Sequence, residues 1–296
     1  MLAPLVTDSP RPTVERQLDE RGAVLFRGLP IDGPEAFERA IGPLVSSTEY
    51  IGGISPRRKL AGQVYESTYY PPHLEIKLHN ELAHLRSWPL RIAFACIEPA
   101  PEGGRTPFAD GRQILARISD RTRDELAARQ LRYAYTYPPP PPDDGPVARR
   151  RFKSWCEAFG THDRAVIERA CAEAGLDHRW NADGSLTTLS VRDAFVRHPR
   201  TGELAWFNQI LLRNAFRLRL RTDRPAAGEA LACTFGDGEP LSRAMLEEID
   251  RVSATSTVDF SWQRGDVLVL DNVLCSHGRT AFVGDRTVLC VLGDER

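Results

Sequence analysis

The stretch GDVLVLDNVLCSHGRTAF, residues 265–282, decides the fold class of this chain. It opens with a Gly-Asp turn, continues with the apolar run 267–270 and the polar pair Asp271-Asn272, and then reaches His277. A short apolar run bounded by turn residues is typical of a strand that is buried on both faces. We therefore expect a buried strand over 267–270, ended by Asp271-Asn272, and a Ser-His-Gly-Arg turn that carries His277.

Short apolar or alternating runs separated by turns recur along the rest of the chain. Strands are expected within residues 23–29, 91–99, 133–137, 185–199, 203–212, 256–262 and 286–292. Helices are expected over 34–44, 110–118, 123–131 and 241–252, and as a pair within about 149–175. Many short strands with few long helices indicate a β-sandwich or barrel, in which the helical pair is an insertion.

Bulk composition favours one ordinary globular domain. The chain has 296 residues, of which 42% are hydrophobic and 27% charged, enough to bury a sizeable core. We expect one domain over 1–296, with a helical insert at about 144–177. The net charge of −1 argues against nucleic-acid binding, and no apolar run is long enough for a membrane span. Six widely separated cysteines and an N-terminus unlike a signal peptide predict a cytoplasmic protein.

Two His-x-Glu pairs lie close together, His73–Glu75 and then His79–Glu81 within LHNELAH (78–84). Such a pair alone is weak evidence, because about one is expected by chance in this composition. On a strand, His79 and Glu81 would share one face. With the distant His277 they have the composition of the two-histidine, one-carboxylate set that holds non-haem Fe(II) and leaves three coordination positions free. A zinc hydrolase would use the same ligand types.

A run of five prolines follows the tyrosine-rich strand, in YPPPPPDDGP (137–146). Such a run is stiff and extended and cannot pair as a central strand. It predicts either a rigid surface connector or the hinge of a lid beside a cleft.

Four stretches resemble one enzyme superfamily. They are LHNELAHLRSWPLRIAFACIEPAPEGGRTPFADGRQIL (78–115), SWCEAFGT (154–161), RHPRTGELAWFNQ (197–209) and GDVLVLDNVLCSHGRTAFVGDRTVLCVL (265–292). Together they resemble the Fe(II)/2-oxoglutarate enzymes of the taurine dioxygenase and clavaminate synthase superfamily. The similarity is greatest to a branch that hydroxylates amino acids in nonribosomal peptide and other specialised-metabolite pathways, including antibiotic biosynthesis. The resemblance implies a mainly β fold with helical insertions, a double-stranded β-helix (jelly-roll barrel).

The resemblance also implies roles for individual residues. His79, Glu81 and His277 fall at the iron ligands, while Thr106 and Arg286 fall where the family binds the distal carboxylate of 2-oxoglutarate. An arginine suits that carboxylate because its planar fork matches it bidentately. The implied cofactor is Fe(II), with 2-oxoglutarate and O2 as cosubstrates. Glu81 argues against halogenation, because halogenating relatives lack this carboxylate.

Under this assignment two other histidines are not ligands. His73 is the histidine of the unused pair, and His84 is expected at the surface or behind the ligands. Polar residues beside the metal and cosubstrate motifs are candidates for substrate contact, with a purely structural hydrogen-bonding role open for each. These candidates are Asn80, Arg86, Asn208, Gln209 and Arg279.

The sequence therefore predicts a dioxygenase that hydroxylates an unactivated C–H of an amino acid or amino-acid-derived small molecule, free or tethered to a peptidyl carrier protein. Desaturation, epoxidation or cyclisation after the same hydrogen abstraction stays open, as does a homo-oligomeric state. A rival from another class is an inactive barrel that serves as a binding module.

Overall fold

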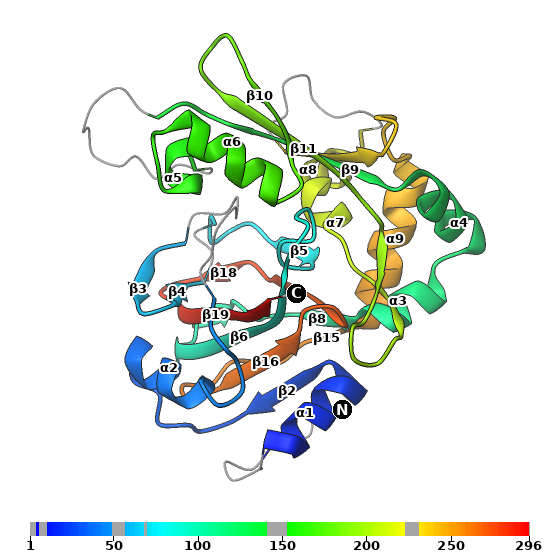
Figure 1. Cartoon of the computed structure of the whole chain (residues 1–296). Helices are drawn as coiled ribbons and strands as arrows, with labels where there is room; N and C mark the ends of the chain where they lie inside the picture. Colours follow the sequence, from blue (N-terminus) through cyan, green and yellow to red (C-terminus); the bar gives the residue numbers. More distant parts are fainter. Residues whose placement is uncertain are drawn as a thin grey trace.

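The computed structural model describes residues 4–5, 11–48, 57–67, 70–140, 153–222 and 231–295. Its largest sheet has seven strands in the order β1-β2-β16-β6-β19-β4-β3 (Figure 1). These strands are β1 (Pro4–Leu5), β2 (Ala23–Phe26), β16 (Val267–Asp271), β6 (Pro89–Glu98), β19 (Thr287–Glu295), β4 (Val64–Glu66) and β3 (Lys59–Ala61). β16 lies between β2 and β6 and is antiparallel to both, so the strand predicted from the apolar run is confirmed.

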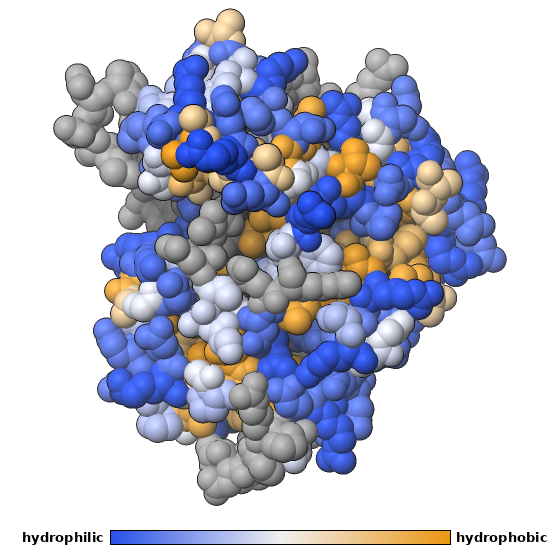
Figure 2. Space-filling view, in the orientation of Figure 1, coloured by the Kyte–Doolittle hydropathy of each residue, from blue (hydrophilic) through white to orange (hydrophobic). Residues whose placement is uncertain are grey.

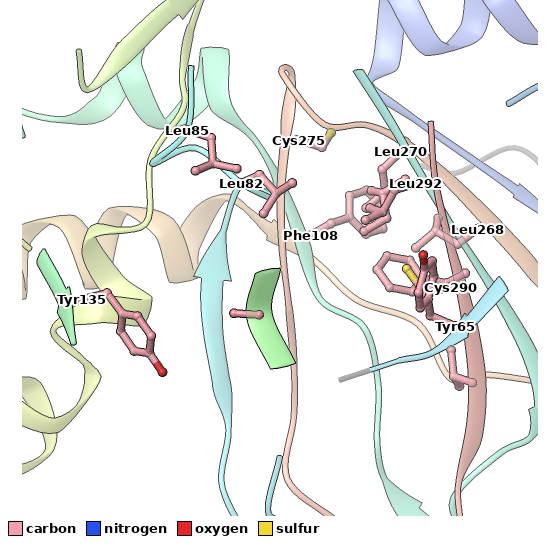
Figure 3. Packing of buried hydrophobic residues seen from close by; sticks show 14 of the residues in the cluster. Tyr65, Leu82, Leu85, Phe108, Tyr135, Leu268, Leu270, Cys275, Cys290 and Leu292 are labelled. Carbon is pink, nitrogen blue, oxygen red and sulfur yellow. The ribbon is translucent and has the colours of Figure 1, made fainter. Parts of the chain in front are cut away.

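The two faces of this sheet are buried against different layers. Along β16, Val267 and Val269 pack in a cluster with Phe37 of α2 (Pro34–Ile41), beside α1 (Arg11–Arg21) on the outer face (Figure 1). Leu268 and Leu270 belong to a second cluster on the inner face (Figure 3). Alternate residues of a strand point to opposite faces, so burial on both faces requires the continuous apolar run seen here.

A four-stranded antiparallel sheet, ordered β15-β8-β17-β5, carries the functional histidines. Its strands are β15 (Thr257–Val258), β8 (Phe108–Asp110), β17 (Cys275–Arg279) and β5 (Ile76–His79). His277 lies within β17 and not in the predicted turn, because β17 pairs with both β8 and β5. The prediction that His79 and Glu81 share one strand face is also wrong. β5 ends at His79, and Glu81 lies in the turn that follows.

A third sheet, ordered β10-β11-β9-β14, is covered by two short helices (Figure 1). It consists of β10 (Asp177–Trp180), β11 (Leu186–Arg192), β9 (Leu131–Tyr137) and β14 (Leu231–Phe235), and the helices are α5 (Trp155–Phe159) and α6 (Arg164–Glu173). The expected helical pair is present where the chain is described. Residues 144–152 of the expected insert, and 141–146 of the proline-rich stretch, lie outside the described residues.

The remaining helices lie around these sheets. They are α3 (Gly111–Arg117), α4 (Asp120–Arg129), α7 (Ile210–Arg213), α8 (Ala215–Leu220) and α9 (Arg243–Ser256). Two short ribbons pair β12 (Phe195–Arg197) with β13 (Leu204–Trp206) and β7 (Glu102–Gly103) with β18 (Phe282–Val283). The strand expected over 203–212 ends at Trp206, and residues 210–212 are helical. That expectation was therefore wrong in its second half.

The mainly β character with helical additions is confirmed. Within the described residues the strands form separate sheets and not one closed barrel. The visible surface is mainly hydrophilic, with apolar residues in small groups (Figure 2). No helix within the described ranges combines the length and apolar character needed to span a bilayer.

Candidate functional site

Two histidines and a glutamate converge between β5 and β17. His277 and His79 are direct partners in the antiparallel register, which brings their rings to a centroid distance of 4.5 Å. The Glu81 Oε2 atom lies 3.8 Å from Nε2 of His277 and 4.0 Å from Nε2 of His79. One potential ligand atom from each residue lies within 4.8 Å of the others. The structure therefore brings together the three residues that the sequence singled out as metal ligands.

Both imidazoles are kept neutral, so that each can offer a nitrogen lone pair to a metal ion. Burial lowers the pKa of His79 and lowers that of His277 well below its usual range. Nδ1 of His79 lies 2.9 Å from the carbonyl oxygen of Lys77, so Nδ1–H donates there and the lone pair of Nε2 is left for a metal. Nδ1 of His277 is buried and has no hydrogen-bond partner among the described residues. Two neutral imidazoles and one carboxylate fit a divalent iron ion.

Asn272 fixes the turn that presents Glu81. Its Oδ1 accepts from the backbone N–H of Glu81 at 2.8 Å, and its Nδ2 donates to the carbonyl of Glu81 at 3.0 Å and to that of Pro89 at 2.8 Å. Leu82, which follows Glu81 in the chain, has a φ of 56°, in the left-handed region. The sequence marked Asn272 only as the end of a strand. Its hydrogen bonds to Glu81 join residues 191 positions apart, so the sequence around Glu81 gives no indication of them.

Arg57 is a second residue of the site that the sequence did not indicate. Its guanidinium donates to Oε2 of Glu81 at 2.7 Å and to Sγ of Cys290 at 2.9 Å, and both members of the ion pair are buried. Burial raises the pKa of Cys290 to about 11, so this thiol is neutral at physiological pH. Burial, followed by the nearby Arg57, lowers the pKa of Lys153 to about 8. The Arg57 guanidinium therefore supplies positive charge directly beside Glu81, the one carboxylate of the triad.

Thr106 and Arg286 lie in adjoining segments. Nε of Arg286 donates to the carbonyl of Gly104, two residues before Thr106, at 2.9 Å, and Nη1 lies 3.3 Å from Oγ of Ser67. Burial lowers the pKa of Arg286 to about 10. Oγ1 of the buried Thr106 accepts from the indole N–H of Trp262 at 3.1 Å, which leaves the hydroxyl proton of Thr106 for another acceptor.

Three of the substrate candidates form a buried scaffold. Asn80 Nδ2 donates to the carbonyl of Asn272 at 2.7 Å, and its Oδ1 accepts from the N–H of Asn208 at 3.1 Å. Asn208 donates to the carbonyl of Ala194 and accepts from the N–H of residue 210. Gln209 Nε2 donates to the carbonyl of Asn80 at 3.1 Å. These contacts hold the segment that carries His79 and Glu81, so a positioning role accounts for these three side chains.

The other two substrate candidates differ in placement. Arg279 is buried, and its terminal nitrogens donate to the carbonyls of Tyr70, Pro71 and Leu74, which holds the chain before β5. Burial lowers the pKa of Arg279 to about 10. Arg86 is exposed and lines an open groove of about 580 Å³ together with Trp88 and other residues.

The other histidines near the motif lie outside the triad. His73 and Glu75 are exposed, in and just after a turn that precedes β5. His84 is buried, with its ring 6.4 Å from that of Tyr133, and it is not part of the cluster of ligand atoms.

Comparison with known proteins identifies the family. The model of the taurine catabolism dioxygenase TauD, TfdA family matches residues 3–292. The chain belongs to this family. It is 32% identical over 288 residues to the dapdiamide synthesis protein DdaC of Enterobacter agglomerans, covering 95% of this chain and 84% of that protein. It is 30% identical over 278 residues to a clavaminate synthase-like protein of Arabidopsis thaliana, covering 93% and 82%.

Solved structures share the fold at lower identity. PvcB of Pseudomonas aeruginosa matches with a TM-score of 0.54 and 15% identity, over 98% of this chain and 81% of that one. An asparagine oxygenase in complex with Fe(II), hydroxyasparagine and succinate matches with a TM-score of 0.55 and 16% identity, over 95% and 79%. The resemblance found in the sequence is thus confirmed. The protein is a dioxygenase that uses Fe(II), 2-oxoglutarate and O2. Membership of this family argues against the two alternatives, a zinc hydrolase and an inactive binding module.

Proposed function

We propose that this dioxygenase hydroxylates an unactivated C–H of an amino acid or amino-acid-derived small molecule in specialised metabolism. The observation that carries the proposal is the convergence of His79, Glu81 and His277 beside the buried guanidinium of Arg57. Three groups on one side of an iron ion leave coordination positions for a cosubstrate and O2. We further propose that the sheets form a double-stranded β-helix, in a single domain whose helical insert spans about 144–177.

In this proposal His79, Glu81 and His277 hold the iron. When bound, the iron with 2-oxoglutarate and O2 supplies the oxidising power for breaking the C–H bond, and the protein supplies geometry. The bond from Nδ1 of His79 to Lys77 fixes the ring tautomer, and Asn272 fixes the backbone of Glu81. Arg57 donates to the Glu81 carboxylate and limits its rotation.

Arg286 and Thr106 are proposed to bind the distal carboxylate of 2-oxoglutarate. The partly buried guanidinium of Arg286 offers paired N–H groups that match a carboxylate, and Thr106 retains a hydroxyl proton to donate. Within the described residues the Arg286 guanidinium has no ion-pair partner. A dianionic cosubstrate would supply the missing negative charge.

The proposed substrate class rests on two relatives and on the charge of the site. DdaC is named for dapdiamide synthesis, and the asparagine oxygenase structure contains hydroxyasparagine. Arg57 and Arg213 both act electrostatically on His79, and positive charge beside the triad suits a substrate that carries a carboxylate. Presentation on a peptidyl carrier protein, and desaturation, epoxidation or cyclisation as the outcome, are alternatives that the same assay separates by product analysis.

Anaerobic titration of the Fe(II)-loaded protein with 2-oxoglutarate tests the cosubstrate site through its charge-transfer absorbance. We expect Arg286→Ala to weaken 2-oxoglutarate binding by roughly 30- to 5,000-fold, because truncating one partner of a buried charge pair costs about 2–5 kcal/mol. Arg286→Lys should recover only part, and Thr106→Val should cost about 1 kcal/mol. Wild-type affinity in Arg286→Ala would overturn the assignment. Succinate release over a panel of amino acids, free and carrier-bound, then tests the substrate class.

A further inference from the structure

Arg213 is a buried cation with no balancing charge among the described residues around it. It is the last residue of α7 and only 3% exposed. Its Nε donates to Oε1 of Gln209 at 3.0 Å. Both terminal nitrogens, Nη1 and Nη2, are buried and have no hydrogen-bond partner among the described residues. A guanidinium carries five N–H donors, so four of them are left without an acceptor.

The groups around Arg213 are neutral. Its guanidinium carbon lies 5.4 Å from the ring centroid of Tyr133, and the groups that interact electrostatically with it are Cys233, Tyr133, Tyr135 and Tyr137. Burial raises the pKa of Cys233 to about 12 and raises the pKa of each tyrosine, so none carries negative charge at physiological pH. A ring face stabilises a cation only weakly compared with the loss of water around a buried charge.

Two other buried arginines have acceptors for both of their terminal nitrogens. Arg217 of α8 is 1% exposed, and its terminal nitrogens donate to Oδ1 of Asn214 at 2.9 Å and to the carbonyl of Leu241 at 2.8 Å. Arg279 likewise donates to three backbone carbonyls. Arg213 differs from both because, in the described part of the chain, only its Nε has an acceptor.

Arg213 is linked through Gln209 to the segment that carries the metal-binding residues. Gln209, which accepts from Arg213, donates in turn to the carbonyl of Asn80, the residue between His79 and Glu81. Arg213 is also among the charges that act on His79. Tyr135, one of its neutral neighbours, belongs to the same buried cluster as Leu82, and both are labelled in Figure 3. Arg213 therefore borders the interior beside the triad.

We propose that Arg213 binds a carboxylate group of the organic substrate, as its specificity-determining anchor. This inference rests on the proposed function and adds the residue that recognises the substrate acid. A carboxylate would accept from both terminal nitrogens at once and neutralise the buried charge. Arg279, which the sequence suggested for this role, is already engaged by backbone carbonyls. An uncharged amide or ester of the same substrate would leave Arg213 unbalanced and would bind weakly.

Acetate, the simplest monocarboxylate, probes the site without knowledge of the substrate. The protein is loaded with Mn(II) and saturating 2-oxoglutarate, so that the cosubstrate site is filled. Its melting temperature is then followed against acetate, with the neutral isostere acetamide in parallel and chloride to keep the ionic strength constant. We expect acetate to stabilise the wild type and acetamide to have no such effect.

Three variants give the comparison. In Arg213→Met the stabilisation by acetate should disappear, which corresponds to acetate binding at least roughly 30-fold weaker. The melting temperature of this variant without acetate should be unchanged or higher, because the substitution removes an unbalanced buried charge. Arg213→Lys should keep part of the acetate response. Arg217→Met is the matched control. It removes a buried, hydrogen-bonded arginine, so the protein should melt earlier but respond fully to acetate.

The outcomes separate this inference from the proposed function. An equal acetate response in wild type and Arg213→Met, or no response in wild type, would overturn the role of Arg213 while the charge-transfer band of Fe(II) and 2-oxoglutarate still stood. Loss of that band in the wild type would instead refute the proposed function. If Arg213→Met fails to fold, Arg213→Lys decides, because an undiminished acetate affinity in that variant contradicts a bidentate anchor.

Discussion

Replacement of Gly278 by alanine should weaken metal binding without touching any ligand. Gly278 follows His277 on β17, where the pairing with β5 is irregular. A Cβ at this position would lie 2.4 Å from the carbonyl oxygen of Ile76, on the strand that carries His79. Real Cβ contacts stay above 3.0 Å, so the two strands must part by roughly 0.6 Å. Overpacking of this kind costs about 1–3 kcal/mol.

The same displacement is large compared with the tolerance of a metal site. Ligand distances hold within about 0.2 Å, so parting β17 from β5 should lower Mn(II) affinity by roughly 10- to 100-fold, as loss of a supporting contact does. Isothermal titration with Mn(II) measures this, and urea unfolding measures the stability loss. Gly33→Ala is the control, because its Cβ would meet nothing closer than 3.8 Å and it should cost only about 0.5 kcal/mol as a helix N-cap. A folded Gly278→Ala protein with wild-type Mn(II) affinity would refute the idea that the strand register sets the ligand separation.

Three further predictions concern the same site. His79→Ala should abolish iron binding and His73→Ala should keep it, as measured by metal content, and the reverse pattern would show that the wrong pair was chosen. Asn272→Ala removes three hydrogen bonds that include both backbone groups of Glu81, so it should cost about 3 kcal/mol in urea unfolding and weaken Mn(II) binding. Burial lowers the pKa of His79 and His277, so the metal-free native protein binds fewer protons than the unfolded chain. This contribution to stability is complete above the unfolded value of 6.5 and is lost as the pH falls below it, so a melting temperature unchanged from pH 7 to pH 5 would contradict it.

The strands and helices that the sequence predicted well are those whose burial follows a simple period. β9 alternates buried and partly buried residues along its length, which matches the alternating tyrosines. α6 begins after Asp163, whose side chain caps its first turn, within the region where the sequence predicts a pair of helices. Local chemistry suffices for such elements because it agrees with their tertiary surroundings.

The predictions that failed were decided by contacts between distant segments. Glu81 leaves the strand because Asn272 takes both of its backbone groups, an interaction that spacing within LHNELAH cannot show. Residues 207–209 leave the expected strand because Asn208 and Gln209 bond to Asn80 and Tyr133. The pairing of His277 with His79 crosses 198 positions, and only the resemblance to a known family anticipated it.

Four arginines whose side chains are buried or partly buried differ in their counter-ions. Arg57 has Glu81 as its counter-ion, whereas Arg213, Arg279 and Arg286 have no carboxylate partner within the described residues, and burial lowers the pKa of each. Burying a positive charge costs free energy, most of all at Arg213, whose terminal nitrogens have no acceptor among the described residues. A dianionic cosubstrate and a carboxylate on the substrate would offset that cost at two separate points. We therefore expect these arginines to favour the binding of two acidic ligands, Arg286 that of 2-oxoglutarate and Arg213 that of the substrate, as the substitutions of each arginine test.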